Sequence, residues 1–177
     1  MINNKYKFEY VPKDPTRVNT KNDYIGAYFT IIEDSELRRN RIIVFWACTV
    51  LIFVSLSVSL FLNNDLFRLF YVVMPYACNV LIWVYLLFAV IGYSGRVDKL
   101  ERKACNNIVN RMKTTALLGI IFSAISVIGA VLSFAFRLAL LNTSNIITFV
   151  FVCMTLVSFV IVFIKALGFK TDIAQMA

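Results

Sequence analysis

The sequence contains no histidine, and only 16% of its 177 residues are charged. Without histidine the chain cannot build a His-ligated haem, a His-based zinc site or a Ser-His nucleophile pair. Its four cysteines are scattered, no two of them have metal-binding spacing, and there is no glycine-rich phosphate loop. We therefore expect no catalytic residues, no cofactor and no metal, and the sequence predicts that the protein is not an enzyme.

Charge is absent above all from the long apolar runs. Hydrophobic residues make up 60% of the chain, whereas soluble domains have roughly 45–50%. A chain of this size has too little interior to bury the excess, which excludes a soluble enzyme and a disordered tail. Four runs without Asp, Glu, Lys or Arg reach the about 20 residues that a helix needs to cross a bilayer. These predicted spans are 42–62, 69–93, 114–136 and 146–164.

The uncharged spans also bear on function. Proton-coupled transporters and intramembrane proteases generally need an ionisable side chain at depth in the membrane, although such a residue is costly to place there. None of the four predicted spans contains one. The sequence therefore argues against both classes of protein.

The basic residues are distributed unevenly between the two sides of these spans. Sixteen of the 18 lie before the first span, between the second and third, or after the fourth, and only Arg68 and Arg137 lie in the other connections. The positive-inside rule places the crowded side, with both termini, in the cytoplasm. Because the connections 63–68 and 137–145 are short, we expect two antiparallel helical hairpins. The predicted fold class is an all-α integral membrane protein, expected in the plasma (cytoplasmic) membrane.

Polar segments flank and interrupt the predicted bundle. The bundle covers 42–164, and the expected cytoplasmic segments at its ends are 1–41 and 165–177. In the connection 94–113, apolar residues recur at helical spacing, which predicts a helical cytoplasmic hairpin. The aromatic and aliphatic residues of about 24–33 predict an amphipathic helix lying at the membrane surface.

The third span carries a stripe of small residues. Its members are separated by 3, 4, 3, 4 and 3 positions and are Ala116, Gly119, Ser123, Ser126, Ala130 and Ser133. This spacing puts them on one helix face with a period of 3.5 residues, which favours close approach of a second helix at a shallow left-handed crossing. Packing inside the bundle, self-association and the lining of a pore are all consistent with the stripe.

The second span holds the most polar residue at depth, Asn79. It lies one turn after Pro75, and Tyr76, Asn79 and Trp83 share one helix face. Pro75 cannot donate a hydrogen bond to the carbonyl of Tyr71, which predicts a kink. We expect Asn79 to hydrogen-bond a hydroxyl group of the first or third helix, and a ligand or permeation site is the alternative.

These features predict a non-catalytic membrane subunit, that is, a scaffold, anchor or accessory protein. It would engage a protein partner through its N-terminal segment and the 94–113 hairpin. The alternative is a homo-oligomeric channel or pore-type effector lined by the small-residue stripe, and a weaker alternative is a facilitator for a small neutral solute at Asn79.

The basic charge predicts contacts with the membrane surface. Basic residues beside a membrane attract anionic lipid headgroups, and no base-reading motif accompanies them, so we expect no nucleic-acid partner. The residues expected to contact anionic lipid or a partner are Arg38, Arg39, Arg41, Arg96, Lys99, Arg102 and Lys103.

Overall fold

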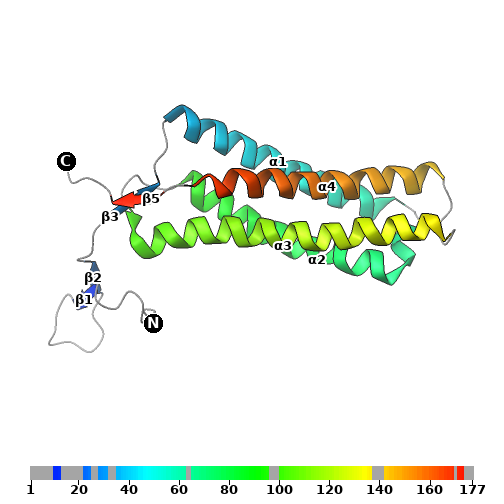
Figure 1. Ribbon diagram of the computed structural model, residues 1–177, viewed down its shortest axis with the longest axis horizontal. Coiled ribbons are helices and arrows are strands. Elements are labelled where there is room, and N and C mark those ends of the chain that lie inside the picture. Colours follow the sequence, from blue (N-terminus) through cyan, green and yellow to red (C-terminus); the bar gives the residue numbers. More distant parts are fainter. Residues whose placement is uncertain are drawn as a thin grey trace.

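The computed structural model in Figure 1 is dominated by an elongated bundle of helices. The residues that the structure describes are 10–12, 22–24, 28–31, 35–62, 65–95, 100–136, 142–169 and 171–173. They include four long helices: α1 (Ser35–Phe61), α2 (Phe70–Ser94), α3 (Arg102–Ala135) and α4 (Thr143–Leu167). All four are long and apolar enough to cross a membrane.

Each predicted span coincides with one of these helices, but two helices begin well before the apolar run. α1 begins at Ser35, with Glu36 in its first turn, where an acidic side chain is favoured by the helix dipole. α3 begins at Arg102, inside the predicted cytoplasmic connection. Hydropathy finds only the apolar part of a helix, so the predicted spans 42–62 and 114–136 leave out the polar turns with which α1 and α3 begin.

The helices alternate in direction. At one end of the bundle, Trp46 near the start of α1 donates a hydrogen bond to Ser94 at the end of α2 (3.2 Å). At the other end, the backbone N–H of Asp65, between α1 and α2, donates to the side chain of Asn145 at the start of α4 (2.9 Å). α3 packs against both α2 and α4, and α4 also packs along α1.

The bundle buries many small polar side chains along with its apolar core, while many large apolar side chains face outward. Ser123, Ser126 and Thr155 are completely buried. Phe61 and Phe70 are 90% and 70% exposed. A soluble protein rarely leaves so much contiguous apolar surface in water, whereas lipid tails solvate it. The structure therefore indicates a membrane helical bundle.

Short strands accompany the helices near the end of the bundle where α1 and α3 begin (Figure 1). β1 (Tyr10–Pro12) pairs with β2 (Asn22–Tyr24). In a second antiparallel sheet, β3 (Tyr28–Ile31) lies between β4 (Leu100–Glu101) and β5 (Thr171–Ile173). Helices still make up most of the described residues, and the strands are small additions to them.

These strands correct two sequence predictions. The interfacial helix expected over 24–33 is wrong for the residues that the structure describes, because Tyr24 ends β2 and 28–31 form β3. Aromatic and β-branched residues are compatible with a strand as well as with an amphipathic helix. Residues 28–31 form a strand because they pair with β4 and β5. The helical connection expected over 94–113 is correct from Arg102 onward, but Leu100–Glu101 are a strand. Residues 96–99 lie outside the described residues.

Candidate functional site

The small-residue stripe of α3 is buried inside the bundle. Ala116, Ser123, Ser126, Ala130 and Ser133 have no exposed surface, and Gly119 is buried with them. The stripe faces both neighbouring helices: Gly119 lies against the ring of Phe159 from α4, and Ser133 lies 3.1 Å from the hydroxyl of Tyr71 from α2. The stripe is therefore buried between α3 and its two neighbours, α2 and α4.

Two members of the predicted intramembrane polar site join α2 to α1. The hydroxyl of Tyr76 donates to the carbonyl oxygen of Ser55 (3.0 Å) and lies 3.1 Å from Oγ of Ser59. The indole N–H of Trp83 donates to the carbonyl oxygen of Thr49 (3.0 Å). Both aromatic side chains therefore bond backbone or hydroxyl groups of α1, and they bracket Asn79 on the same face of α2.

Asn79 itself has no such partner. Its side chain is completely buried, and neither Oδ1 nor Nδ2 has a hydrogen-bond partner among the described residues. The predicted hydrogen bond to a hydroxyl group of the first or third helix is therefore wrong. α2 continues as a helix through Pro75, one turn before it.

Several hydroxyl groups of the other three helices bond within their own helix. Thr49, Ser126 and Thr155 each donate to the carbonyl four residues earlier in their own helix, at 2.7, 3.1 and 3.0 Å. Serine and threonine commonly bond their own helix in this way, which leaves them less available to a neighbour. Within the described part of the chain, the hydroxyl groups of Ser55, Ser123 and Thr148 also lack a partner. Each of the four helices thus contributes one buried, unpartnered polar side chain.

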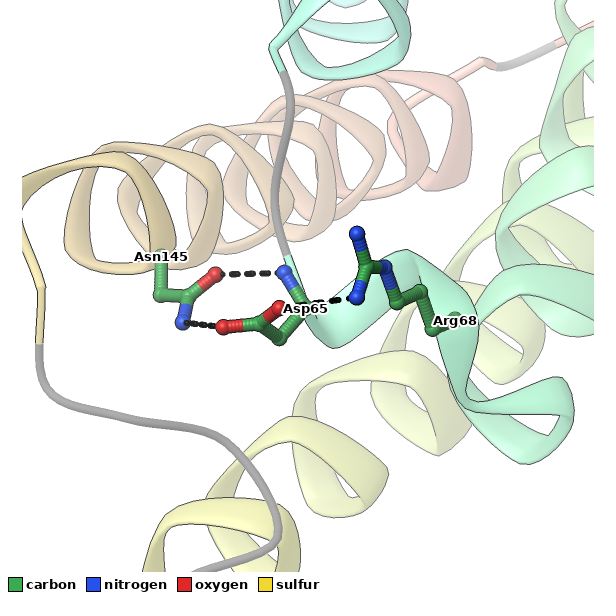
Figure 2. A network of polar contacts seen from close by, with 3 residues as sticks. All are labelled: Asp65, Arg68 and Asn145. Atoms are coloured by element: carbon green, nitrogen blue, oxygen red, sulfur yellow. Dashed lines mark hydrogen bonds and ion pairs between the residues drawn. The ribbon is translucent and has the colours of Figure 1, made fainter.

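A second polar cluster, which the sequence did not predict, is shown in Figure 2. It lies where α4 begins, at the opposite end of the bundle from the strands (Figure 1). Asn145 of α4 is completely buried. Its Oδ1 accepts from the backbone N–H of Asp65 (2.9 Å), and its Nδ2 donates to Oδ2 of Asp65 (3.3 Å). Arg68 forms an ion pair with the same carboxylate at 3.7 Å. The cluster fastens the α1–α2 connection to the start of α4.

The sequence did carry one signal for this cluster. Asp65 is the only acidic residue in the two connections on that side of the spans. The amide of Asn142 also caps α4 by accepting from the backbone N–H of Asn145 (2.8 Å), so these two asparagines have different tasks.

Removing the carboxylate of Asp65 should destabilise the bundle. We expect Asp65→Ala to cost about 1–3 kcal/mol, because the buried amide of Asn145 loses an acceptor. Arg68→Gln should cost less than about 1 kcal/mol, since the Arg68 side chain is 74% exposed and exposed ion pairs contribute little. Thermal unfolding of both variants in detergent micelles measures the difference, and equal losses would contradict this assignment.

The sequence predicts that seven basic residues contact anionic lipid or a partner. In the structure, those that are described lie in different surroundings. Arg39 is exposed and Arg38 is half-buried. Arg41 instead donates to the carbonyl oxygen of Gly168 just beyond α4 (3.0 Å) and lies 5.1 Å above the ring of Phe169. A cation at a helix C-terminus is favoured by the helix dipole, so Arg41 serves the fold itself.

The other basic residues of that set are described only in part. Arg102 and Lys103 begin α3, but their side chains, like Arg96 and Lys99, lie outside the described residues. Their predicted contact with anionic lipid or a partner stays a prediction.

Within the described ranges, no three His, Cys, Asp or Glu side chains lie together in a way that could hold a metal ion. The chain matches no protein-family model, no curated protein and no solved structure. Its function therefore has to be inferred from its own geometry.

Proposed function

We propose that the protein is a non-catalytic membrane subunit, an anchor or accessory protein that holds a protein partner on the basic side of the membrane. In this proposal the four helices form two antiparallel hairpins in the plasma membrane, with both termini in the cytoplasm. The uneven distribution of basic residues supports that orientation.

One observation carries the proposal, namely the sheet of order β4-β3-β5. It joins three segments that the predicted spans separate in sequence: the N-terminal segment, the connection between α2 and α3, and the C-terminal tail. Phe29 of β3 lies opposite both Leu100 of β4 and Ile173 of β5. The segments that the sequence assigns to one side of the membrane thus come together as a single surface, which is what a docking platform requires.

The edges of this sheet offer a means of attachment. Among the strands that the structure describes, β4 and β5 each pair only with β3. An edge strand presents unpaired N–H and C=O groups, and an extended segment of a partner can add to it as a further strand.

Burial of the small-residue stripe favours the subunit proposal over the pore alternative. A pore lined by the small-residue stripe needs those side chains to face water, whereas they are buried against α2 and α4. A facilitator for a small neutral solute is the second candidate function, and the unpartnered amide of Asn79 is the observation that favours it.

A substitution in the central strand tests the docking proposal. Thr30 of β3 lies opposite Asp172 of β5. Proline cannot donate to a sheet ladder and is poorly tolerated in a central strand, so Thr30→Pro should break the sheet, whereas the β-branched Thr30→Val should preserve it. We expect the full chain, isolated in mild detergent from its native membrane, to form a complex of defined stoichiometry with a different protein. Thr30→Val should keep that complex and Thr30→Pro should lose it.

Two controls make the result interpretable. The far-ultraviolet circular dichroism of both variants should match the unsubstituted protein, because helices make up most of the described residues and dominate this signal. If the unsubstituted chain forms only rings of its own copies that conduct ions across liposomes, the subunit proposal is wrong and the pore alternative gains support. Retention of the complex by Thr30→Pro would also contradict the role given to the sheet.

A further inference from the structure

A groove of about 340 Å³ opens between α2 and α3, nearer to the end of the bundle that carries the sheet. One side of it is the ring of Tyr85 from α2, and the other is a continuous face of α3. The residues that line it are Tyr85, Asn110, Arg111, Thr114, Thr115 and Leu118.

The groove changes from polar to apolar along α3. Asn110 and Arg111 precede the uncharged run that begins at Thr114, while Leu118 lies one turn inside that run. Leu118 and Tyr85 are 42% and 72% exposed, so an apolar surface continues outward from the groove. This order of polar and apolar groups matches a ligand that has a polar head and a hydrocarbon chain.

Arg111 gives the polar end of the groove its charge. It is exposed, and the structure gives it no ion pair or hydrogen bond to any other described residue. A guanidinium group binds phosphate through paired hydrogen bonds, and an arginine near the membrane surface attracts anionic headgroups. The hydroxyl-bearing Thr114 lies three residues further along the same helix face and supplies a donor beside it.

We propose that this groove is a binding site for one anionic phospholipid. The guanidinium of Arg111 and the hydroxyl of Thr114 hold the headgroup phosphate, and an acyl chain lies along Leu118 and the ring of Tyr85. The volume falls within the range of about 300–1,000 Å³ that is usual for small-molecule sites.

A second groove provides an internal comparison. It lies between α1 and α4, has a similar volume of about 320 Å³, and is lined by Leu51 together with α4 residues such as Phe149 and Val157. Its described lining residues are all uncharged. It can accept an acyl chain but offers no charge to select a headgroup, so selectivity for anionic lipid is specific to the groove with Arg111.

Binding of phosphatidylglycerol to the full chain tests the proposal. Native mass spectrometry of the detergent-solubilised protein should find one phosphatidylglycerol retained in preference to phosphatidylcholine with the same acyl chains. Arg111→Gln should weaken this binding by about tenfold or more, the size of one charge-assisted hydrogen bond. The matched control is Lys113→Gln, which removes the same charge two residues away at a position outside the groove; it should change the affinity little.

Several outcomes would overturn the site. Equal weakening by Arg111→Gln and Lys113→Gln would mean that only diffuse positive charge is sensed. Equal retention of phosphatidylcholine would contradict selection of an anionic headgroup. Displacement of the lipid by glycerol phosphate at the same concentration would mean that the acyl chain makes no contribution. The site depends on the membrane character of the bundle and not on the proposed protein partner, so loss of the partner complex would leave this result unaffected.

Discussion

Gly119→Ala should destabilise the bundle by about 1–3 kcal/mol, the usual cost of overpacking a tight core, although it adds a single methyl group. A Cβ atom at this position would lie closer than 3.0 Å to three carbons of the Phe159 ring. Real Cβ atoms essentially never approach another atom so closely. The ring of Phe159 is completely buried, so it can move aside only if the residues packed around it also move. The substitution must therefore disturb the packing of α3 against α4.

Gly92→Ala is the matched control for this prediction. Gly92 is also a glycine within a helix, but a Cβ atom there would meet no atom of the described residues within 4 Å. Because alanine is the better helix former, this variant should be neutral or more stable by up to about 1 kcal/mol. The free energy of unfolding, measured in the same micelles, should therefore fall for Gly119→Ala and stay the same or rise for Gly92→Ala.

A double variant tests whether contact with the Phe159 ring causes the loss of stability in Gly119→Ala. Phe159→Leu shortens the side chain that the new methyl group meets, so Gly119→Ala should cost less in that background than in the unsubstituted protein. A further readout is the oligomeric mass. If Gly119→Ala leaves monomer stability unchanged but alters that mass, the stripe is a self-association face and its assignment to internal packing is wrong.

The sequence was sufficient to find the four long helices, because an uncharged run of bilayer length is a local property. The small sheet could not be found in the same way. β3 pairs with β4 and β5 across about 70 and 140 residues of sequence, and nothing within Tyr28–Ile31 identifies those distant partners. The aromatic and aliphatic residues of that segment are equally compatible with an amphipathic helix. Its pairing with β4 and β5 is what makes it a strand.

Helical spacing can predict which residues of the polar site share a helix face, but not which atoms they bond. It puts Tyr76, Asn79 and Trp83 on one face of α2. Their partners were not predictable, since the carbonyl oxygens of Ser55 and Thr49 are backbone groups that every residue has. The bond between Asp65 and Asn145 joins positions 80 residues apart and depends on which helix ends meet.

Asn79→Leu should stabilise the protein by about 1–3 kcal/mol, the cost of burying an amide without hydrogen bonds. Its Oδ1 and Nδ2 atoms have no partner within the described part of the chain, and the side chain is completely buried. Leucine has a similar size and shape and no polar atoms, so it removes the unpaired groups with little change in packing. The thermal unfolding midpoint in micelles should rise by several degrees.

Asn145→Leu is the control that isolates the effect of pairing. Asn145 is an equally buried asparagine, but its side chain is hydrogen-bonded to Asp65. The same substitution there should therefore destabilise the protein by about 1–3 kcal/mol, because it leaves polar groups of the α1–α2 connection without their partner. Two chemically identical changes should thus have opposite signs.

The outcome for Asn79 also separates the two candidate functions. Natural proteins retain a costly buried group where activity needs it, and removing such a group raises stability while lowering activity. A facilitator should therefore lose solute flux in liposomes on Asn79→Leu, whereas a subunit should keep its partner complex and become more stable. If Asn79→Leu instead destabilises the protein, the amide is already satisfied by a molecule from outside the chain, and the stability prediction is wrong.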